Sequence, residues 1–391
     1  MNYPIIILNP GKEKALKNFH QWIFSGAIDK SDDFQDGDIL EVQSSKGEFL
    51  AYGYFNKRNS LAGRIISFEK KDPLIVIENN IRKALSLRKD FFDEKITNAY
   101  RLINAEADNL PGLIVDKYNE VLVLQITTLG MEKLKNHIIS ILKKESGIQT
   151  FYEKSSAPSR REEGLSDFQG LLFGEDVSEV EILENKMKFI VDIKNSQKTG
   201  FYLDQREMRD FIRKFSKGKK VLNCFSYSGG FTLAALYGKA KYVHSVEISD
   251  TALSLLQRNL LLNDFDDKNN SCYKEDVFKF LRAQDLTEYD LIILDPPAFV
   301  KRKSELYQAM RGYKDINLQV FKKVKPGTLV LTSSCSHYVD EKTFQMLIFE
   351  AAKDAKRNVK ILQKHHLAFD HPINIYHPEG EYLKSLFLQI E

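Results

Sequence analysis

Residues 219–237 read KKVLNCFSYSGGFTLAALY, and this stretch decides the fold. The apolar run at 219–225 predicts a strand, and residues 229–237 predict a helix that opens on two glycines. Glycines at the start of a helix let the main chain approach a ligand closely and leave amide groups pointing toward it. The stretch therefore predicts a strand, a ligand-binding turn and a helix.

The same alternation continues to the C-terminal end. Strands are predicted in KYVHSVEI (241–248), SCYKEDV (271–277), DLIILDPP (290–297) and GTLVLTSS (327–334), and helices at 250–262 and from near Lys303 and Asp340. Continuous apolar strands that alternate with amphipathic helices indicate an α/β fold with a doubly wound, mostly parallel sheet. Such a sheet binds its ligands beyond the carboxyl ends of its strands, so the functional residues are expected there.

The sequence before this region has a different texture. Closely spaced strands with polar turns, in ILEVQSS (39–45), GEFLAYGYF (47–55) and GRIISFE (63–69), predict a small, mostly-β unit. Helices near 74–87 and 131–144, a strand at 150–153 and a loop at 155–164 predict a small α+β block. A length of 391 residues suits two or three domains, which we place at 1–72, 73–180 and 181–391.

Composition narrows the class of protein. With 43% hydrophobic and 28% charged residues the chain is globular, and no stretch has the length of apolar sequence that a membrane span needs. Three scattered cysteines predict neither a disulfide framework nor a metal site, so we expect a cytoplasmic protein.

The charge balance is misleading. The 57 Lys and Arg residues against 54 Asp and Glu residues argue weakly against a nucleic-acid partner. The segment from Ala298 to Lys325, however, contains eight basic and two acidic residues. This is an excess of six positive charges beside the Asp295 turn. This segment borders the proposed ligand-binding cleft, where the phosphates of a nucleic acid would have to lie. The alternative is that the segment is a basic helix face that is only exposed to solvent.

The first three strand ends suggest a nucleoside-containing ligand. The loop after the first strand lacks the G-x-G-x-x-G pattern, which disfavours a dinucleotide. Glu247, about 20 residues further on, suits the two hydroxyls of a ribose, the alternative being a solvated carboxylate. Asp276 suits an exocyclic amine, with Val277 and Phe278 over an adenine face, although a carboxylate before a helix is commonplace.

The last two strand ends carry candidate chemistry. Two prolines stop the strand before them and hold Asp295 over the cleft. Cys335 follows the next strand, at the ligand end, and is a candidate nucleophile. Cys224 and Cys272 suit the ordinary role of a small buried residue.

A ribose-binding acid, a glycine loop without the dinucleotide pattern and an Asp-Pro-Pro turn together indicate S-adenosylmethionine. The chain resembles the bacterial cytosine-5 methyltransferases of large-subunit ribosomal RNA that carry an N-terminal PUA domain. The resemblance rests on FHQWIFSGAI (19–28), RLINAEADNLPGLIVDKY (101–118), KTGFYLDQR (198–206), VLNCFSYSGGF (221–231), DPPAFVKRKSEL (295–306), RGYKDIN (311–317), SCS (334–336) and HPEGEYLK (377–384). It implies a PUA-like domain, a central α+β domain and a Rossmann-like class I methyltransferase domain with a seven-stranded sheet.

The resemblance also implies roles for individual residues. Cys335 would attack carbon 6 of the cytosine, and Asp295 would hydrogen-bond the base. The implied S-adenosylmethionine contacts are Tyr202, Gln205, Asn223, Phe225, Ser226, Gly229, Glu247, Ile248, Asp276, Val277, Phe278 and Asp295. Lys198 and Arg206, within the same motif as Tyr202, are candidate contacts of either the cofactor or an RNA phosphate. The further candidate RNA contacts come from the basic segment: Lys301, Arg302, Lys303, Arg311 and Lys314. The expected partner is large-subunit ribosomal RNA, with no membrane and no metal, and a homodimer is left open.

Other functions fit the same residues. Transfer to an amino group of a base needs the Asp-Pro-Pro turn but no cysteine, and uracil admits the same attack by Cys335 as cytosine. An RNA-binding assembly factor without turnover belongs to another class. A nicotinamide oxidoreductase is disfavoured by the glycine pattern.

Overall fold

The computed structural model describes residues 3–266, 268–300 and 303–391. The chain forms two compact units: Met1–Leu183 with Val191–Leu203 and Phe369–Gly380, and Glu184–Ile190 with Asp204–Ala368 and Glu381–Glu391. Within the described ranges, no helix combines the length and the apolar character that crossing a membrane requires.

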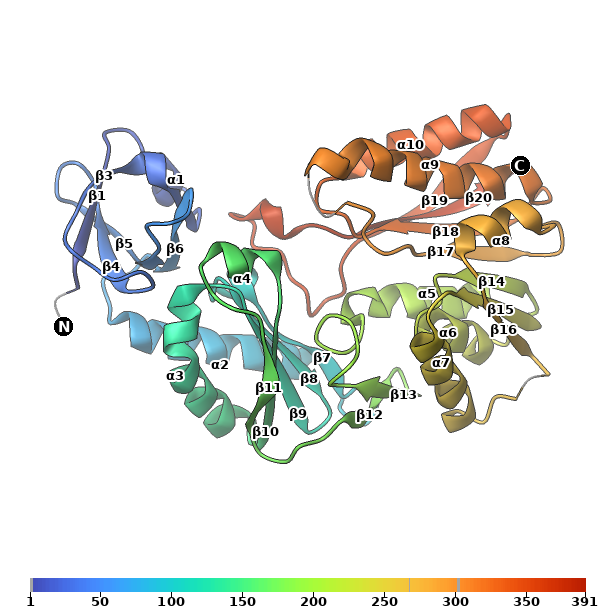
Figure 1. Cartoon of the computed structure of the whole chain (residues 1–391), viewed down its shortest axis with the longest axis horizontal. Helices are drawn as coiled ribbons and strands as arrows, with labels where there is room; N and C mark the ends of the chain where they lie inside the picture. The colour runs from blue at the N-terminus through green and yellow to red at the C-terminus, as the bar shows by residue number, and fades with distance from the viewer. Residues whose placement is uncertain (1–2, 267, 301–302) are drawn as a thin grey trace. The chain divides into compact units, whose positions relative to one another are not determined.

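The first unit begins with a six-stranded sheet in the order β2-β6-β5-β4-β1-β3 (Figure 1). Its elements are β1 (Ile5–Leu8), α1 (Lys14–Lys17), β2 (Trp22–Phe24), β3 (Ile28–Ser31), β4 (Ile39–Gln43), β5 (Phe49–Phe55) and β6 (Leu61–Ser67). Apart from the parallel pair β1–β4, neighbouring strands are antiparallel. The predicted mostly-β unit is confirmed.

A five-stranded sheet in the order β11-β10-β9-β8-β7 completes this unit, together with three helices. The elements are α2 (Pro73–Phe91), β7 (Ala99–Asn104), β8 (Leu113–Tyr118), β9 (Val121–Ile126), α3 (Leu129–Ser146), β10 (Thr150–Ser155), α4 (Pro158–Glu162) and β11 (Phe168–Phe173). The loop predicted at 155–164 is wrong, because Pro158 starts α4 and the buried Arg160 donates to the carbonyl of Ile126 at 2.9 Å. A two-stranded ladder of β12 (Glu179–Glu184) and β13 (Met187–Asp192) follows.

The second unit is a seven-stranded sheet in the order β16-β15-β14-β17-β18-β20-β19. Its strands are β14 (Lys220–Cys224), β15 (Tyr242–Glu247), β16 (Asn270–Lys274), β17 (Leu291–Leu294), β18 (Leu329–Ser334), β19 (Val359–His365) and β20 (Lys384–Ile390). Strands β14 to β18 are parallel, whereas β20 runs antiparallel to both of its neighbours. The predicted doubly wound, mostly parallel sheet is confirmed.

Helices cover both faces of this sheet (Figure 1). They are α5 (Arg206–Phe215), α6 (Gly230–Tyr237) and α7 (Asp250–Leu262) on one face, and α8 (Val277–Ala283), α9 (Leu306–Lys323) and α10 (Glu341–Ala355) on the other. The apolar run of β17 is fully buried between them. Strand β14 pairs with β15 on one side and with β17 on the other, so the strand order reverses there, which is where sheets of this type bind ligands.

Candidate active site

The loop between β14 and α6 is built on left-handed backbone. Phe225, Tyr227 and Gly229 have φ angles of 61°, 46° and 88°. A Cβ at Gly229 would lie 2.8 Å from the side chain of Leu256, so glycine suits this position for both reasons. The amide of Ser226 donates to the carbonyl of Val246 at 3.1 Å, which ties the loop to β15.

Buried oxygens without a partner line this loop. Asn223 Nδ2 donates to Thr232 Oγ1 at 2.9 Å, and that hydroxyl lies 2.7 Å from the hydroxyl of Ser245. Within the described part of the chain, Asn223 Oδ1 and the hydroxyls of Ser226 and Ser228 are buried without a hydrogen-bond partner. Buried polar atoms are normally paired, so these oxygens mark a place where a ligand can supply the partner.

Main-chain amides hold the Glu247 carboxylate at the end of β15. Oε2 accepts from the amide of Tyr227 at 3.0 Å, and Oε1 accepts from the amides of Ile248 at 2.9 Å and Ser249 at 3.0 Å. The side chain of Ile248 is 62% exposed. The carboxylate is therefore fixed beside the glycine loop, with lone pairs left for further donors.

The three predicted adenine contacts, residues 276–278, have different surroundings. Asp276 caps α8, because its Oδ1 accepts a first-turn amide at 3.0 Å, and Val277 is buried in the core. The Phe278 ring lies 6.4 Å from that of Phe225 and 5.7 Å from that of Phe299, centroid to centroid. These partly buried rings give the site an aromatic wall that suits a flat ligand ring.

Asp295 and Cys335 follow the neighbouring strands β17 and β18. Gln205 Nε2 donates to Asp295 Oδ1 at 2.9 Å. Cys335 Sγ lies 3.9 Å from the Pro296 carbonyl, and its side chain is partly exposed. Cys224 is fully buried, and this burial raises the pKa of its thiol. Of these two cysteines, only Cys335 combines exposure with a place at the strand ends.

The sequence pattern does not single out Lys384, which starts β20 opposite Ser334. Its ammonium donates to the carbonyls of Ser336 and Tyr382, both at 2.6 Å. Burial lowers the pKa of Lys384 to about 8, and attraction to the Cys335 charge partly opposes that shift. In the sequence, Lys384 is marked by its place at the end of HPEGEYLK (377–384) and at the head of the apolar strand SLFLQI.

The segment before the sheet is divided between the units. Lys198 and Tyr202 belong to the first unit, where the ammonium lies 4.4 Å from the centre of the tyrosine ring. Arg206 begins α5 in the second unit, is 2% exposed and lies 3.9 Å from Glu184. The predicted phosphate contact of Arg206 is corrected, because its guanidinium is packed inside the protein.

The basic segment carries less unpaired charge than its sequence implies. Lys301, Arg302 and the side chain of Lys303 lie outside the described residues. Arg311 is exposed on α9. Lys314 is paired with two acids of α10, Asp354 at 2.8 Å and Glu350 at 3.2 Å. Arg311 therefore keeps the exposure that the RNA prediction requires, and Lys314 is largely neutralised.

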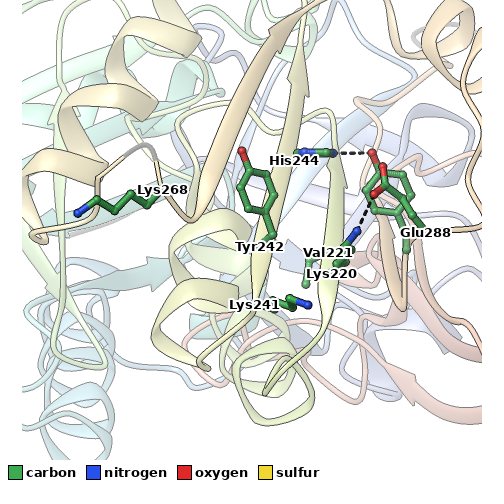
Figure 2. A pocket seen from close by; sticks show the side chains of 8 residues that line it. Lys220, Val221, Lys241, Tyr242, His244, Lys268 and Glu288 are labelled. Atoms are coloured by element: carbon green, nitrogen blue, oxygen red, sulfur yellow. Dashed lines mark hydrogen bonds and ion pairs between the residues drawn. The ribbon is translucent and has the colours of Figure 1, made fainter.

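A cavity of about 380 Å³ lies at the opposite end of β14 and β15 (Figure 2). Lys220 and Glu288 point toward each other there at 2.9 Å, and His244 Nδ1 lies 2.6 Å from the Tyr289 hydroxyl. Its lining includes none of the predicted site residues. Because parallel sheets bind ligands at their carboxyl ends, this cavity is not the candidate active site.

Comparisons with known proteins agree with this fold. A family model described as S-adenosylmethionine-dependent methyltransferase matches residues 163–364, and one described as PUA-like domain matches residues 6–68. A solved structure described as "A putative sam-dependent methyltransferase from Streptococcus mutans" is 25% identical, with a TM-score of 0.84 over 100% of both chains. Another, of a methyltransferase complexed with SAH, is 25% identical with a TM-score of 0.86, also over 100% of both chains.

The class is thus an S-adenosylmethionine-dependent methyltransferase. Two relatives are named "Ribosomal RNA large subunit methyltransferase I": one from Alteromonas mediterranea, 39% identical over 98% of both chains, and one from Aeromonas salmonicida, 40% identical over 98% of both. The chain belongs to the family of these proteins.

The residues present fit this cofactor. The unpartnered oxygens of Asn223 and Ser226 offer acceptors or donors, the Glu247 carboxylate suits the ribose hydroxyls, and the Phe278 ring suits the adenine.

We expect Glu247→Gln to weaken S-adenosylmethionine binding by roughly ten- to a hundredfold, because hydrogen bonds to a charged group contribute about 1.5–3 kcal/mol. Titration calorimetry measures this. Glu288→Gln, at the other end of the same sheet, is the matched control and should bind normally. Equal affinity of Glu247→Gln and the native protein would remove Glu247 from the cofactor site.

Proposed function

We propose that the protein methylates carbon 5 of a cytosine in large-subunit ribosomal RNA, with Cys335 as the nucleophile. The names of the relatives support the RNA substrate, and the PUA-like domain suits an RNA partner. The observation that carries the chemistry is the position of Cys335, partly exposed and 3.9 Å from the Pro296 carbonyl in the turn that begins with Asp295.

Carbon 5 of a pyrimidine is a poor nucleophile until carbon 6 is attacked. The Cys335 thiolate forms a bond to carbon 6, and the electron pair of the 5,6 double bond makes carbon 5 nucleophilic. Bound S-adenosylmethionine supplies the methyl group on a sulfonium that leaves as a neutral thioether. Loss of the carbon 5 proton to a base then restores the double bond and releases the Cys335 thiolate. The target base must be unstacked for the thiolate to reach it.

Asp295 supports cytosine over uracil. An ionised carboxylate only accepts hydrogen bonds, so it pairs with the exocyclic amine of cytosine but not with the carbonyl of uracil in the same position. Gln205 donates to one oxygen of Asp295 at 2.9 Å, which orients the carboxylate and favours its charged form. The pair therefore suits a base that presents an amine.

We expect Cys335→Ala to lower methyl transfer to unmodified ribosomal RNA by about a thousandfold or more, because the covalent route is lost. Cofactor binding should stay intact. Labelled-methyl transfer followed by mass spectrometry of the nucleosides measures rate and product, with Cys272→Ala as the control. Methylation retained by Cys335→Ala would favour transfer to an amino group, and no transfer by the native protein to any ribosomal RNA would favour an assembly factor.

We expect Lys384 to influence how the rate of methyl transfer depends on pH. Its ammonium interacts with the Cys335 charge and so favours the thiolate, as long as the pH is below the lysine pKa of about 8. In Lys384→Met the thiolate should form only at higher pH, so the rising limb of the pH–rate profile moves upward. The activity lost near neutral pH should partly return in alkaline buffer. Lys364→Met, an exposed lysine of β19, is the control. An equal loss at every pH would mean that Lys384 only supports the fold.

A further inference from the structure

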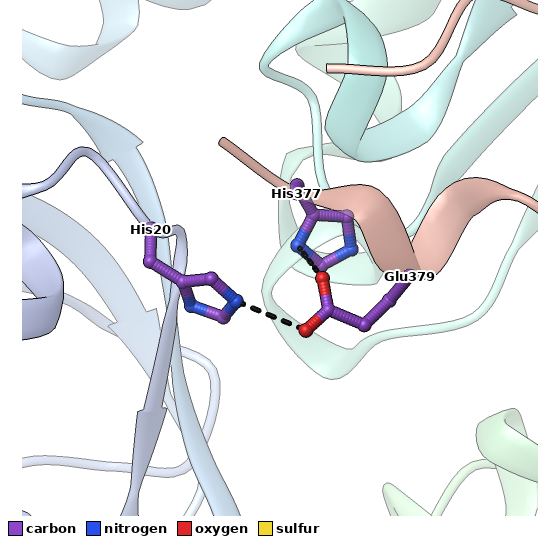
Figure 3. Close-up of side chains that lie close together, drawn as sticks. All are labelled: His20, His377 and Glu379. Atoms are coloured by element: carbon purple, nitrogen blue, oxygen red, sulfur yellow. Dashed lines mark hydrogen bonds and ion pairs between the residues drawn. The ribbon is translucent and has the colours of Figure 1, made fainter. Parts of the chain in front are cut away.

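His20, His377 and Glu379 come together in the first unit although 357 residues separate the two histidines (Figure 3). His20 lies between α1 and β2, and His377 and Glu379 lie at the short 3₁₀ turn Pro378–Gly380. One ligand atom from each residue lies within 4.8 Å of the other two. We propose that these three side chains bind a divalent transition-metal cation, with Zn²⁺ as the best match.

The distances suit a four-coordinate ion. His20 Nε2 lies 3.3 Å from Glu379 Oε1, and His377 Nδ1 lies 3.4 Å from Glu379 Oε2. Ligands about 2.0–2.2 Å from a tetrahedral Zn²⁺ are separated by about 3.3–3.5 Å. Two imidazoles and one carboxylate suit zinc and its neighbours, whereas Ca²⁺ and Mg²⁺ prefer oxygen ligands throughout.

His377 supplies an independent observation. Its ring is 3% exposed and packs edge-on against Trp22 with 4.4 Å between centroids. Within the described residues its Nδ1 is buried and lacks a hydrogen-bond partner, although Figure 3 shows it directed at Glu379. A buried nitrogen of this kind gains more from a metal than one already paired.

The position of the proton on the His20 ring limits the affinity of the site for a metal ion. Its Nδ1 accepts from the amide of Trp22 at 3.3 Å, so the neutral ring carries its proton on Nε2, toward Glu379. When a cation binds Nε2, the neutral ring has to move its single N–H proton to Nδ1, which breaks this long hydrogen bond. The side chains of His20 and Glu379 are 23% and 37% exposed, which leaves the fourth position to water.

The site would act as a clip within the first unit. It joins the segment 369–380 to the N-terminal sheet, and closing so long a loop restricts the unfolded chain. Composition alone predicts no metal, because the three ligands are neither cysteines nor neighbours in the sequence.

Full-length protein without an affinity tag, stripped with a chelator and titrated with Zn²⁺ in a calorimeter, tests the proposal. We expect one equivalent to bind, and Co²⁺ to give the visible absorption of a four-coordinate site. His377→Asn and Glu379→Gln should each weaken binding at least tenfold, and Zn²⁺ should raise the melting temperature of the native protein only. Glu379→Gln keeps an acceptor for His20, so it should fold.

The matched control is His137→Asn, which removes an exposed histidine from α3 and should bind like the native protein. Native protein that binds no more Zn²⁺ than Glu379→Gln would overturn the proposal. So would an equal loss of binding in His137→Asn, since that would show adventitious surface binding.

Discussion

Strand β14 pairs in parallel with β15 on one side and with β17 on the other, and the candidate active site depends on this reversal of strand order. Helices that leave the two neighbours cover opposite faces of the sheet, so the carboxyl end of β14 stays uncovered. Glu247 ends β15, and Asp295 and Cys335 follow β17 and β18, so the parallel pairing of these strands places all three residues at the same edge of the sheet. Chemistry spread over nearly 90 residues of sequence is brought together by backbone pairing alone.

The parallel pairing of the strands explains which residues of the candidate site could be predicted from the sequence. Asp295 and Cys335 come directly after apolar parallel strands, and in a parallel sheet the position in the sequence fixes the edge. Lys384 could not be found in this way, because β20 is antiparallel and Lys384 faces Ser334 only through a register that the sequence does not display. The same limit applies to Lys314, whose acidic partners on α10 lie about 40 residues away. A contact that depends on pairing between segments far apart in the chain could not be predicted from the sequence pattern.

Buried polar groups at structural positions differ in their hydrogen bonding from those at the candidate active site. The buried carboxylate of Glu163, in the first unit, accepts from Arg64 at 2.6 Å, from Asn56 at 3.0 Å and from Asn59 at 2.9 Å. Such a satisfied network stabilises the fold without needing a ligand. Around the glycine loop, by contrast, buried oxygens of Asn223 and Ser226 lack partners among the described residues. Buried polar atoms are normally paired, so unpaired oxygens on a loop at the carboxyl end of a parallel strand are expected where a cofactor binds.

Two lysines with lowered pKa values show that the surroundings of a group, and not its pKa alone, distinguish a functional position from a structural one. Burial lowers the pKa of Lys154 to about 8, as it does for Lys384. Lys154 donates to the main-chain carbonyl of Ser196 at 2.7 Å, and among the described residues Asp192 is the charge that supports its ammonium. The Lys384 ammonium is supported by the charge of the Cys335 thiolate first and by Asp340 and Glu381 after it. A perturbed pKa alone therefore identifies a buried lysine, and only its position beside Cys335 gives Lys384 a means to change the reactivity of another group.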